Sequence, residues 1–184
     1  MNRPDNFPHR RSIRLQDYDY SQAGAYFVTI CAQGRECLFG GIESDAMVLN
    51  EFGFAVRDEW LRTAEIRTEI QTGECVVMPN HFHGIVVIGA DMSGIRRGTA
   101  RRAPTVERFG HPIAGSLPTI VRAFKSAVTK RINEIRQTPG VAVWQRNYYE
   151  HVIRNEADYR KIAEYIADNP RRWEEDVLYP EAGQ

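Results

Sequence analysis

The chain has 184 residues, of which 42% are hydrophobic and 26% charged, and its formal net charge is zero. This composition is typical of a soluble globular protein, and the length suits one domain with a sizeable core. No apolar run reaches the roughly 18 residues of a membrane span, and the polar, basic start does not resemble a secretory signal. We therefore expect a cytoplasmic protein with one domain over residues 1–184, whose three cysteines, Cys31, Cys37 and Cys75, stay reduced.

The first part of the chain predicts an arm, two strands and a helix. Residues 1–20 show no regular pattern, and we expect an irregular arm there. The β-branched and aromatic stretch Tyr26–Cys31 predicts a buried strand, and Asp45–Leu49 predicts another after a turn at Gly40-Gly41. Asn50 is well placed to cap the helix that follows it.

The middle of the chain predicts a strand pair, a loop and a long helix. Strands at Glu74–Met78 and Phe82–Ile88 flank a break at Pro79-Asn80, because proline cannot donate to a strand ladder. Residues 89–115 are rich in Gly, Pro and Arg without apolar periodicity, which predicts a long basic loop that is functional or disordered. Apolar residues then recur at helical spacing over 116–136, with Ser116 as the N-cap.

The last part of the chain predicts two short strands and a helix. Val141–Gln145 and Tyr149–Ile153 have strand composition. Asn155 can cap a final helix, which Pro170 ends after Asn169. Strands and helices interleave with short links, apart from the basic loop. This order indicates an α+β domain with helices packed on a sheet.

The zero net charge hides a strongly basic segment. Between Ser93 and Arg136, ten basic residues face two acidic ones, so this segment carries +8 and the rest of the chain −8. A basic stripe on a neutral protein attracts a polyanion at one surface. A solvated helix face beside a disordered loop would have the same composition, and both interpretations stay open.

Two histidines, His81 and His83, stand at the start of the apolar stretch FHGIVVI. Side chains alternate along a strand, so residues two apart share a face, with α-carbons roughly 6.8 Å apart. Two imidazoles at this spacing can reach one metal ion. They can equally be two hydrogen-bonded histidines near a strand end.

Tyr165 and Asn169 lie one turn apart on the final predicted helix. At about 100° per residue, Asn169 falls within the apolar face and Tyr165 on its flank. A buried asparagine needs a polar partner, and a metal ion is one. Lys161, one turn before Tyr165, is placed to lower the phenol pKa from about 10. The alternative for Tyr165 is an amphipathic side chain at the edge of the core.

Together these motifs resemble the REP-associated tyrosine transposases, domesticated relatives of the small single-tyrosine HUH transposases of bacterial insertion sequences. The stretches that carry the resemblance, in the expected order within residues 9–173, are YFVTI at 26–30, VVMPNHFHGI at 76–85, FKS at 124–126, WQRNYYEHVIR at 144–154 and YIxxNP at 165–170. The resemblance implies a ferredoxin-like antiparallel sheet, with the His-x-His pair on a central strand and the catalytic tyrosine on a C-terminal helix.

The resemblance also implies an activity and the residues that perform it. Proteins of this family recognise a DNA hairpin and cleave single-stranded DNA beside it through a 5′-phosphotyrosine intermediate, in DNA transposition or REP-element mobilisation. By position, Tyr165 would be the nucleophile, and His81, His83 and Asn169 the ligands of Mg²⁺ or Mn²⁺. His151 is a candidate general base or DNA contact.

Single-stranded DNA is held by cations together with aromatic side chains on which its bases stack. The candidates for these contacts are Arg11, Arg14, Arg122, Lys125, Lys130, Trp144, Tyr148 and Tyr149.

The sequence thus favours a metal-dependent single-stranded DNA endonuclease and strand transferase, a monomer or homodimer that associates with the nucleoid when bound to DNA. Two alternatives stay open. One is a non-catalytic module or repressor that binds hairpin nucleic acid. The other is a small metal hydrolase that uses His81, His83 and a carboxylate such as Asp158.

Overall fold

The computed structural model describes residues 18–89 and 113–180, and its centre is a four-stranded sheet. In spatial order the strands are β4 (Ile70–Met78), β5 (His81–Ile88), β1 (Gly24–Cys31) and β6 (Tyr149–Ile153). A separate hairpin pairs β2 (Gly40–Glu43) with β3 (Ala46–Leu49). The helices are α1 (Glu51–Ile66), α2 (Leu117–Ile135), α3 (Glu156–Asp168) and the 3-10 helix η3 (Pro170–Glu175).

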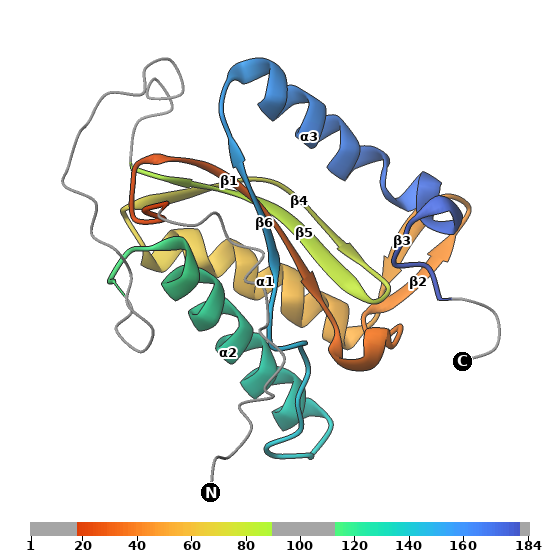
Figure 1. Ribbon diagram of the computed structural model, residues 1–184. Helices are drawn as coiled ribbons and strands as arrows, with labels where there is room; N and C mark the ends of the chain where they lie inside the picture. Colours follow the sequence, from red (N-terminus) through yellow and green to blue (C-terminus); the bar gives the residue numbers. More distant parts are fainter. Residues whose placement is uncertain (1–17, 90–112, 181–184) are drawn as a thin grey trace, which may run out of the picture.

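The order of the strands is that of a ferredoxin-like βαββαβ fold. Strand β5 lies between β1 and β4, which α1 connects, and β1 lies between β5 and β6, which α2 connects. All three neighbouring pairs are antiparallel. Figure 1 shows α1 and α2 together on one face of the sheet and α3 across the other, as two crossovers of the same hand require. The ferredoxin-like α+β fold predicted from the sequence is confirmed.

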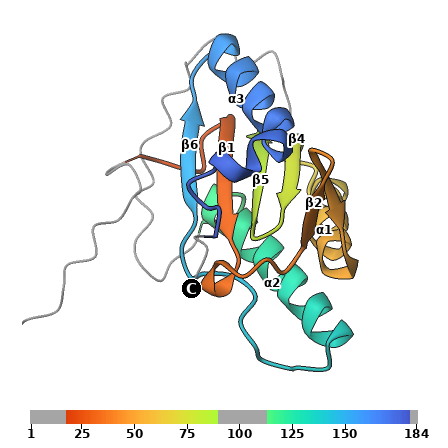
Figure 2. The same cartoon turned by 90° about the vertical axis from the view of Figure 1, so that its right-hand side faces the viewer.

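The β2–β3 hairpin lies beside the end of the sheet that carries the start of β5. Strand β3 contacts α1, β4 and η3. Figure 2 shows the hairpin beyond β4, at the edge of the sheet opposite β6. The hairpin and η3 therefore flank the same end of the sheet.

The two faces of the sheet have separate cores. The face toward α1 and α2 buries a large cluster that includes Tyr26, Phe82, Trp60 and Phe124. The face toward α3 buries a smaller cluster, in which Phe27, Ile85 and Ile153 pack against Ile166. Because side chains alternate, His81 and His83 share the face of Ile85 and therefore point toward α3.

Asparagines begin two of the helices, as predicted. The Asn50 Oδ1 atom accepts hydrogen bonds from the Phe52 and Gly53 amides, both at 3.0 Å, and α1 follows. The Asn155 Oδ1 atom accepts from the Asp158 amide at 2.9 Å and starts α3. Helix α3 ends before Pro170, where the chain continues as η3. The direction of α3, which carries the tyrosine, is therefore set by local sequence at both ends.

Two local predictions are wrong. Gly40-Gly41 belongs to β2, and the hairpin turns at Ser44 and Asp45, whose φ angles of 49° and 63° suit a tight two-residue turn. A Cβ on Gly40 would lie 2.1 Å from the Val48 carbonyl oxygen, so a glycine is needed here for β2 and β3 to approach each other this closely. The stretch Val141–Gln145 forms no strand and contributes a single bridge, between Trp144 and Ala32.

The predicted arm at 1–20 and basic loop at 89–115 lie almost entirely outside the described residues. In the part of the chain that the structure describes, no helix combines the length and hydrophobicity needed to cross a membrane.

Candidate active site

The centre of the site is the histidine pair at the start of β5. His81 and His83 are both buried beneath α3 and η3. Their Nε2 atoms lie 3.0 Å apart. At this distance one ring can donate a neutral N–H···N hydrogen bond to the other, and a cation that binds between the two nitrogens would replace that proton.

Asn80 sets the tautomer of His81. Its Nδ2 atom donates to the Leu178 carbonyl at 2.8 Å and to the Arg35 carbonyl at 3.2 Å, so its Oδ1 atom is left to accept. That oxygen lies 2.8 Å from His81 Nδ1, which therefore carries the proton. The Nε2 atom of His81 consequently carries a lone pair, which is directed at His83 Nε2 and could bind a ligand placed between the two rings. A second partner that fixes the ring is usual for a metal-binding histidine.

Thr29 forms the corresponding hydrogen bond to His83. Its hydroxyl lies 2.8 Å from His83 Nδ1, across the β1–β5 pairing that sets Thr29 opposite His83. A hydroxyl can donate or accept, so His83 can present either a proton or a lone pair at Nε2. The ring can therefore change its role when a cation arrives without losing this hydrogen bond.

Both histidines are held neutral. Burial lowers the pKa of His81 to about 4, although Asp176 and Asn169 oppose this shift. Burial also lowers the pKa of His83 well below its usual value, and the neighbouring His81 adds to the effect. Neutral imidazole is the form that binds a metal ion, so the pair is ready to do so at neutral pH.

Helix α3 brings Tyr165 and Asn169 to this pair. The Tyr165 hydroxyl lies 3.4 Å from His83 Nε2, and the residue is 43% exposed. Asn169 is 4% exposed, and its Oδ1 atom has no hydrogen-bond partner among the described residues. A buried carbonyl oxygen without a partner costs about 1–3 kcal/mol. The inward direction predicted for Asn169 is thus observed, and its free oxygen suits a cation.

The phenol of Tyr165 is protonated in this arrangement. Burial raises its pKa, and the Asp176 carboxylate adds to the increase, whereas Asn169 and Arg172 lower it. The cation that favours the phenolate is therefore Arg172 of η3. The predicted helper, Lys161, is exposed on α3, one turn before Tyr165.

A carboxylate that the sequence did not point to completes the site. The Asp176 Oδ2 atom lies 3.9 Å from His81 Nε2, and the side chain is 6% exposed. The possible ligand atoms of His81, His83 and Asp176 all lie within 4.8 Å of one another. A pocket of about 140 Å³ between Tyr165, Asn169, Arg172 and Asp176 adjoins them. Asp176 follows a segment without periodicity, so no pattern could have placed it here.

The carboxylate expected for a hydrolase, Asp158, is engaged elsewhere. Its Oδ2 atom lies 3.1 Å from His151 Nε2 and accepts from the Arg154 amide at 3.2 Å. These contacts link β6 to the start of α3. Because β6 pairs with β1, His151 lies opposite Phe27 and not opposite a residue of β5. The structure therefore places His151 with Asp158 and gives Asp176 the position predicted for Asp158.

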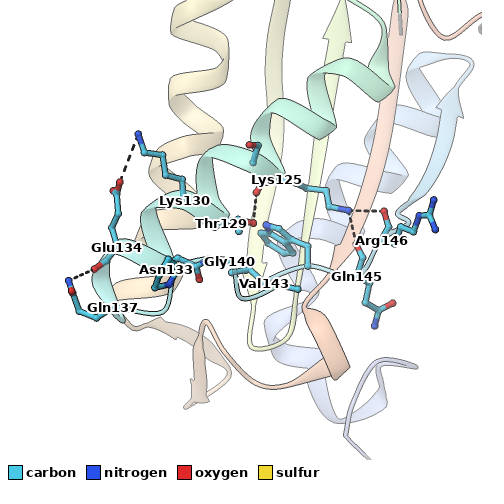
Figure 3. Close-up of a pocket in the computed structure, with 14 residues that line it drawn as sticks. Lys125, Thr129, Lys130, Asn133, Glu134, Gln137, Gly140, Val143, Gln145 and Arg146 are labelled. Atoms are coloured by element: carbon cyan, nitrogen blue, oxygen red, sulfur yellow. Dashed lines mark hydrogen bonds and ion pairs between the residues drawn. The ribbon is translucent and has the colours of Figure 1, made fainter. Parts of the chain in front are cut away.

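Two of the DNA-contact candidates on α2 are free to meet a ligand. Arg122 and Lys130 are exposed, and Lys130 faces Glu134 at 3.9 Å. Lys125 differs, because its ammonium donates to the carbonyls of Gln145 at 2.6 Å and Arg146 at 3.1 Å (Figure 3). Burial lowers the pKa of Lys125 to about 8. These two hydrogen bonds hold the segment before β6 against α2. Lys125 also lines a pocket of about 820 Å³ between them.

The aromatic candidates divide in the same way. Trp144 is 6% exposed and packs against Phe39 and Phe124 at ring distances of 5.0 and 6.1 Å, so it belongs to the core and offers no face to a base. Its prediction as a stacking residue is wrong. Tyr149 is 51% exposed at the start of β6, and Tyr148 is partly buried. Arg11 and Arg14 lie outside the described residues.

Comparisons with known proteins agree with this fold. No family model matches the chain. A protein of Haemophilus influenzae, described as uncharacterized, is 42% identical over 175 residues, which are 93% of each chain. Among solved structures, a REP-associated tyrosine transposase bound to a REP hairpin has a TM-score of 0.54 and 21% identity, over 93% of this chain and 92% of that one. The resemblance seen in the sequence motifs is thus confirmed at the level of the fold.

Proposed function

We propose that this chain, which belongs to the same family as the Haemophilus influenzae protein and has the fold of a REP-associated tyrosine transposase, is a metal-dependent enzyme that cleaves and rejoins single-stranded DNA. The observation that carries the proposal is the Tyr165 hydroxyl, 3.4 Å from the Nε2 atom of a buried, neutral histidine pair. A nucleophile directly beside a cation site is what phosphoryl transfer requires.

The residues present fit a divalent cation. His81 and His83 converge through unprotonated or exchangeable Nε2 atoms, and Asn169 adds a buried oxygen without a partner. These three side chains would hold Mg²⁺ or Mn²⁺, and imidazole ligands favour Mn²⁺. When bound, the cation neutralises charge on the non-bridging oxygens of the scissile phosphate.

Tyr165 supplies the covalent step. Its oxygen attacks the phosphorus, the bond from phosphorus to the 3′-oxygen breaks, and the 5′-phosphate stays on the tyrosine. The phenol proton leaves to solvent on the exposed side of the ring, and the departing 3′-oxygen takes up a proton. The phosphotyrosine bond conserves the energy of the phosphodiester, so a second 3′-hydroxyl can reverse the step without ATP.

The DNA partner is inferred from the charge and from the register of the sheet. The solved transposase of this fold is bound to a REP hairpin, and we extend this partner to the present chain. Tyr149 lies opposite Thr29, which lies opposite His83, so its exposed ring is on the same face about 10 Å from the histidine. A base next to the scissile phosphate can stack there, while Arg122 and Lys130 hold the flanking strand.

The test uses a single-stranded hairpin oligonucleotide from the repeats beside the gene, labelled at its 3′ end, with Mn²⁺ or Mg²⁺. A labelled, protease-sensitive adduct should appear on a denaturing gel with the wild type and vanish with Tyr165→Phe and on chelation. Tyr159→Phe is the matched control, since this tyrosine lies on the same helix and donates to Glu74 at 2.6 Å.

Each other result has a definite meaning. An adduct that survives Tyr165→Phe moves the nucleophile to another tyrosine. Tight hairpin binding without an adduct under either metal refutes the enzyme and leaves a DNA-binding module.

A further inference from the structure

Among the described residues, no Lys or Arg side chain forms an ion pair with the enclosed carboxylate of Asp176. Its side chain is 6% exposed, and within residues 18–89 and 113–180 its ion-pair partner is His81, at 3.9 Å. An enclosed carboxylate without a counter-charge is costly, and such groups in proteins are paired or bind metals.

The two oxygens of Asp176 have different surroundings. Oδ1 accepts a hydrogen bond from the Leu178 amide at 2.7 Å, which fixes the orientation of the carboxylate. Oδ2 faces the histidine pair. The hydrogen-bonded oxygen thus holds the carboxylate in place, and the other oxygen is directed at the candidate cation position.

The distances suit ligands of one ion. In an octahedral site with bonds of about 2.1 Å, adjacent ligand atoms lie about 3.0 Å apart and opposite ones about 4.2 Å apart. The histidine Nε2 atoms are 3.0 Å apart, and Oδ2 of Asp176 is 3.9 Å from His81 Nε2. Small shifts therefore place all three atoms around a single cation.

A second contact connects the same segment to the histidines. Asn80 accepts from His81 Nδ1 and donates to the Leu178 carbonyl at 2.8 Å. The segment that carries Asp176 is thus held to the residue that orients His81. Asn169, at the other side of the small pocket, contributes its buried oxygen without a partner.

We propose that Asp176 is a further protein ligand of the divalent cation, so that the segment after η3 completes the metal site together with His81, His83 and Asn169. This inference rests on the proposed function, because it concerns the same cation. A six-coordinate cation held by these four side chains would still have room for oxygens of the DNA phosphate. The negative charge of Asp176 strengthens binding of a divalent cation beyond what neutral ligands provide.

A role for Asp176 as the base that deprotonates Tyr165 is less well supported. The structure gives the pair no hydrogen bond, whereas Tyr165 lies beside His83 at 3.4 Å. The carboxylate acts on Tyr165 through its charge, which raises the pKa of the phenol. The geometry therefore favours ligation of the cation over proton transfer.

The experiment measures Mn²⁺ binding to the full chain by calorimetry, without DNA. Asp176→Asn keeps an oxygen for the Leu178 amide but removes the charge, and we expect Mn²⁺ affinity to fall at least tenfold. Glu175→Gln, at the adjacent exposed carboxylate that lines the same pocket, should change it less than twofold. His83→Ala is the reference for loss of the site.

Thermal unfolding separates ligation from a structural role. In EDTA, Asp176→Asn should be as stable as the wild type or more so, because the uncompensated charge is gone. With Mn²⁺, the wild type should gain more in Tm than the variant. A variant that is less stable in EDTA but gains as much as the wild type would overturn the proposal.

The remaining outcomes distinguish this inference from the proposed function. If Asp176→Asn binds Mn²⁺ like the wild type while His83→Ala does not, Asp176 is not a ligand and the metal-dependent enzyme stands. If adduct formation rises in Asp176→Asn at unchanged affinity, the carboxylate obstructs the site, which also refutes ligation. If the wild type binds neither Mn²⁺ nor Mg²⁺, the metal dependence of the proposed function fails first.

Discussion

At the scale of single residues, the site depends on polar side chains that hold the two histidines in place. Asn80 lies in the turn between β4 and β5, where it fixes the His81 tautomer and contacts the carbonyls of Arg35 and Leu178. Thr29 is a residue of strand β1, and its hydroxyl orients the His83 ring. Packing restrains both buried rings, and these hydrogen-bond partners favour the orientation in which both Nε2 atoms face the same point.

Asn80→Ala tests this supporting role. The change leaves two backbone carbonyls and His81 Nδ1 without their partner, so the free energy of unfolding should fall by about 2–3 kcal/mol. Affinity for Mn²⁺ should fall about tenfold or more, as for other residues that orient metal-binding histidines. Urea unfolding in EDTA and calorimetry measure the two effects.

Asn147→Ala is the matched control, because Asn147 is exposed in the segment before β6. It should leave both quantities unchanged. Unaltered Mn²⁺ affinity in Asn80→Ala would show that the His81 ring keeps its orientation without this partner.

At the scale of elements, the position of α3 decides whether Tyr165 can react. The helix crosses the face of the sheet on Phe27, Ile85 and Ile153, and it approaches β4 closely at Gly73. A Cβ at Gly73 would lie 2.5 Å from the Tyr159 hydroxyl and 3.2 Å from Ile85 Cβ. This glycine sits where the pairing of β4 with β5 shifts register, between Thr72 and Cys75.

Gly73→Ala should therefore displace α3. We expect the free energy of unfolding to fall by about 1–3 kcal/mol, the usual cost of overpacking. Adduct formation should fall by more than the loss of folded protein accounts for, because the Tyr165 hydroxyl moves away from His83. Chemical unfolding and the gel assay, run on the same preparations, measure both.

A double variant makes this prediction specific. Gly73→Ala with Tyr159→Phe removes the oxygen that the new methyl group would meet, so part of the lost adduct formation should return. No recovery in the double variant would mean that Gly73 acts through something other than the placement of α3.

At the scale of the whole molecule, the proposed DNA contacts spread over two faces of the sheet. Tyr165 belongs to α3 and Tyr149 shares the sheet face of His83, whereas Arg122 and Lys130 belong to α2, which covers the opposite face of the sheet (Figure 1). A DNA strand that meets both sets must pass around the edge formed by β6. We therefore expect the positive charge on α2 to affect the affinity and the position of the DNA, whereas the chemical step takes place at the histidine pair.

Neutralising Arg122 and Lys130 with Gln should weaken binding of a single-stranded hairpin oligonucleotide. The slope of log affinity against log salt should become shallower by about 1.4, at about 0.7 per lost contact to single-stranded DNA. Fluorescence anisotropy across a salt series measures this. Lys125→Met should instead lower stability, because its ammonium binds two backbone carbonyls.

Arg57→Gln with Arg62→Gln removes the same charge from α1 and serves as the control. Its slope should match that of the wild type. A slope that stays unchanged in the Arg122 and Lys130 variant would place α2 outside the DNA interface.

Local patterns determined a large part of this protein in advance. Strand alternation alone placed His81 and His83 on one face, and helical periodicity turned Asn169 inward beside Tyr165. The caps at Asn50 and Asn155 follow from side chains that bond amides two or three residues away. These features depend on neighbours in the sequence, so the sequence displays them directly.

Tertiary structure decided what joins distant parts of the chain. Asp176 reaches His81, and Asn80 reaches Leu178, across contacts that no periodicity records. The same packing buries Trp144 and engages the Lys125 ammonium, although both side chains suit DNA binding by type. Local patterns therefore predicted an α+β domain, the histidine pair and the directions of Tyr165 and Asn169, and the family resemblance predicted the ferredoxin-like sheet. Only the packing of the C-terminal segment against the start of β5 decided which further oxygens surround them, because that contact depends on geometry and not on spacing.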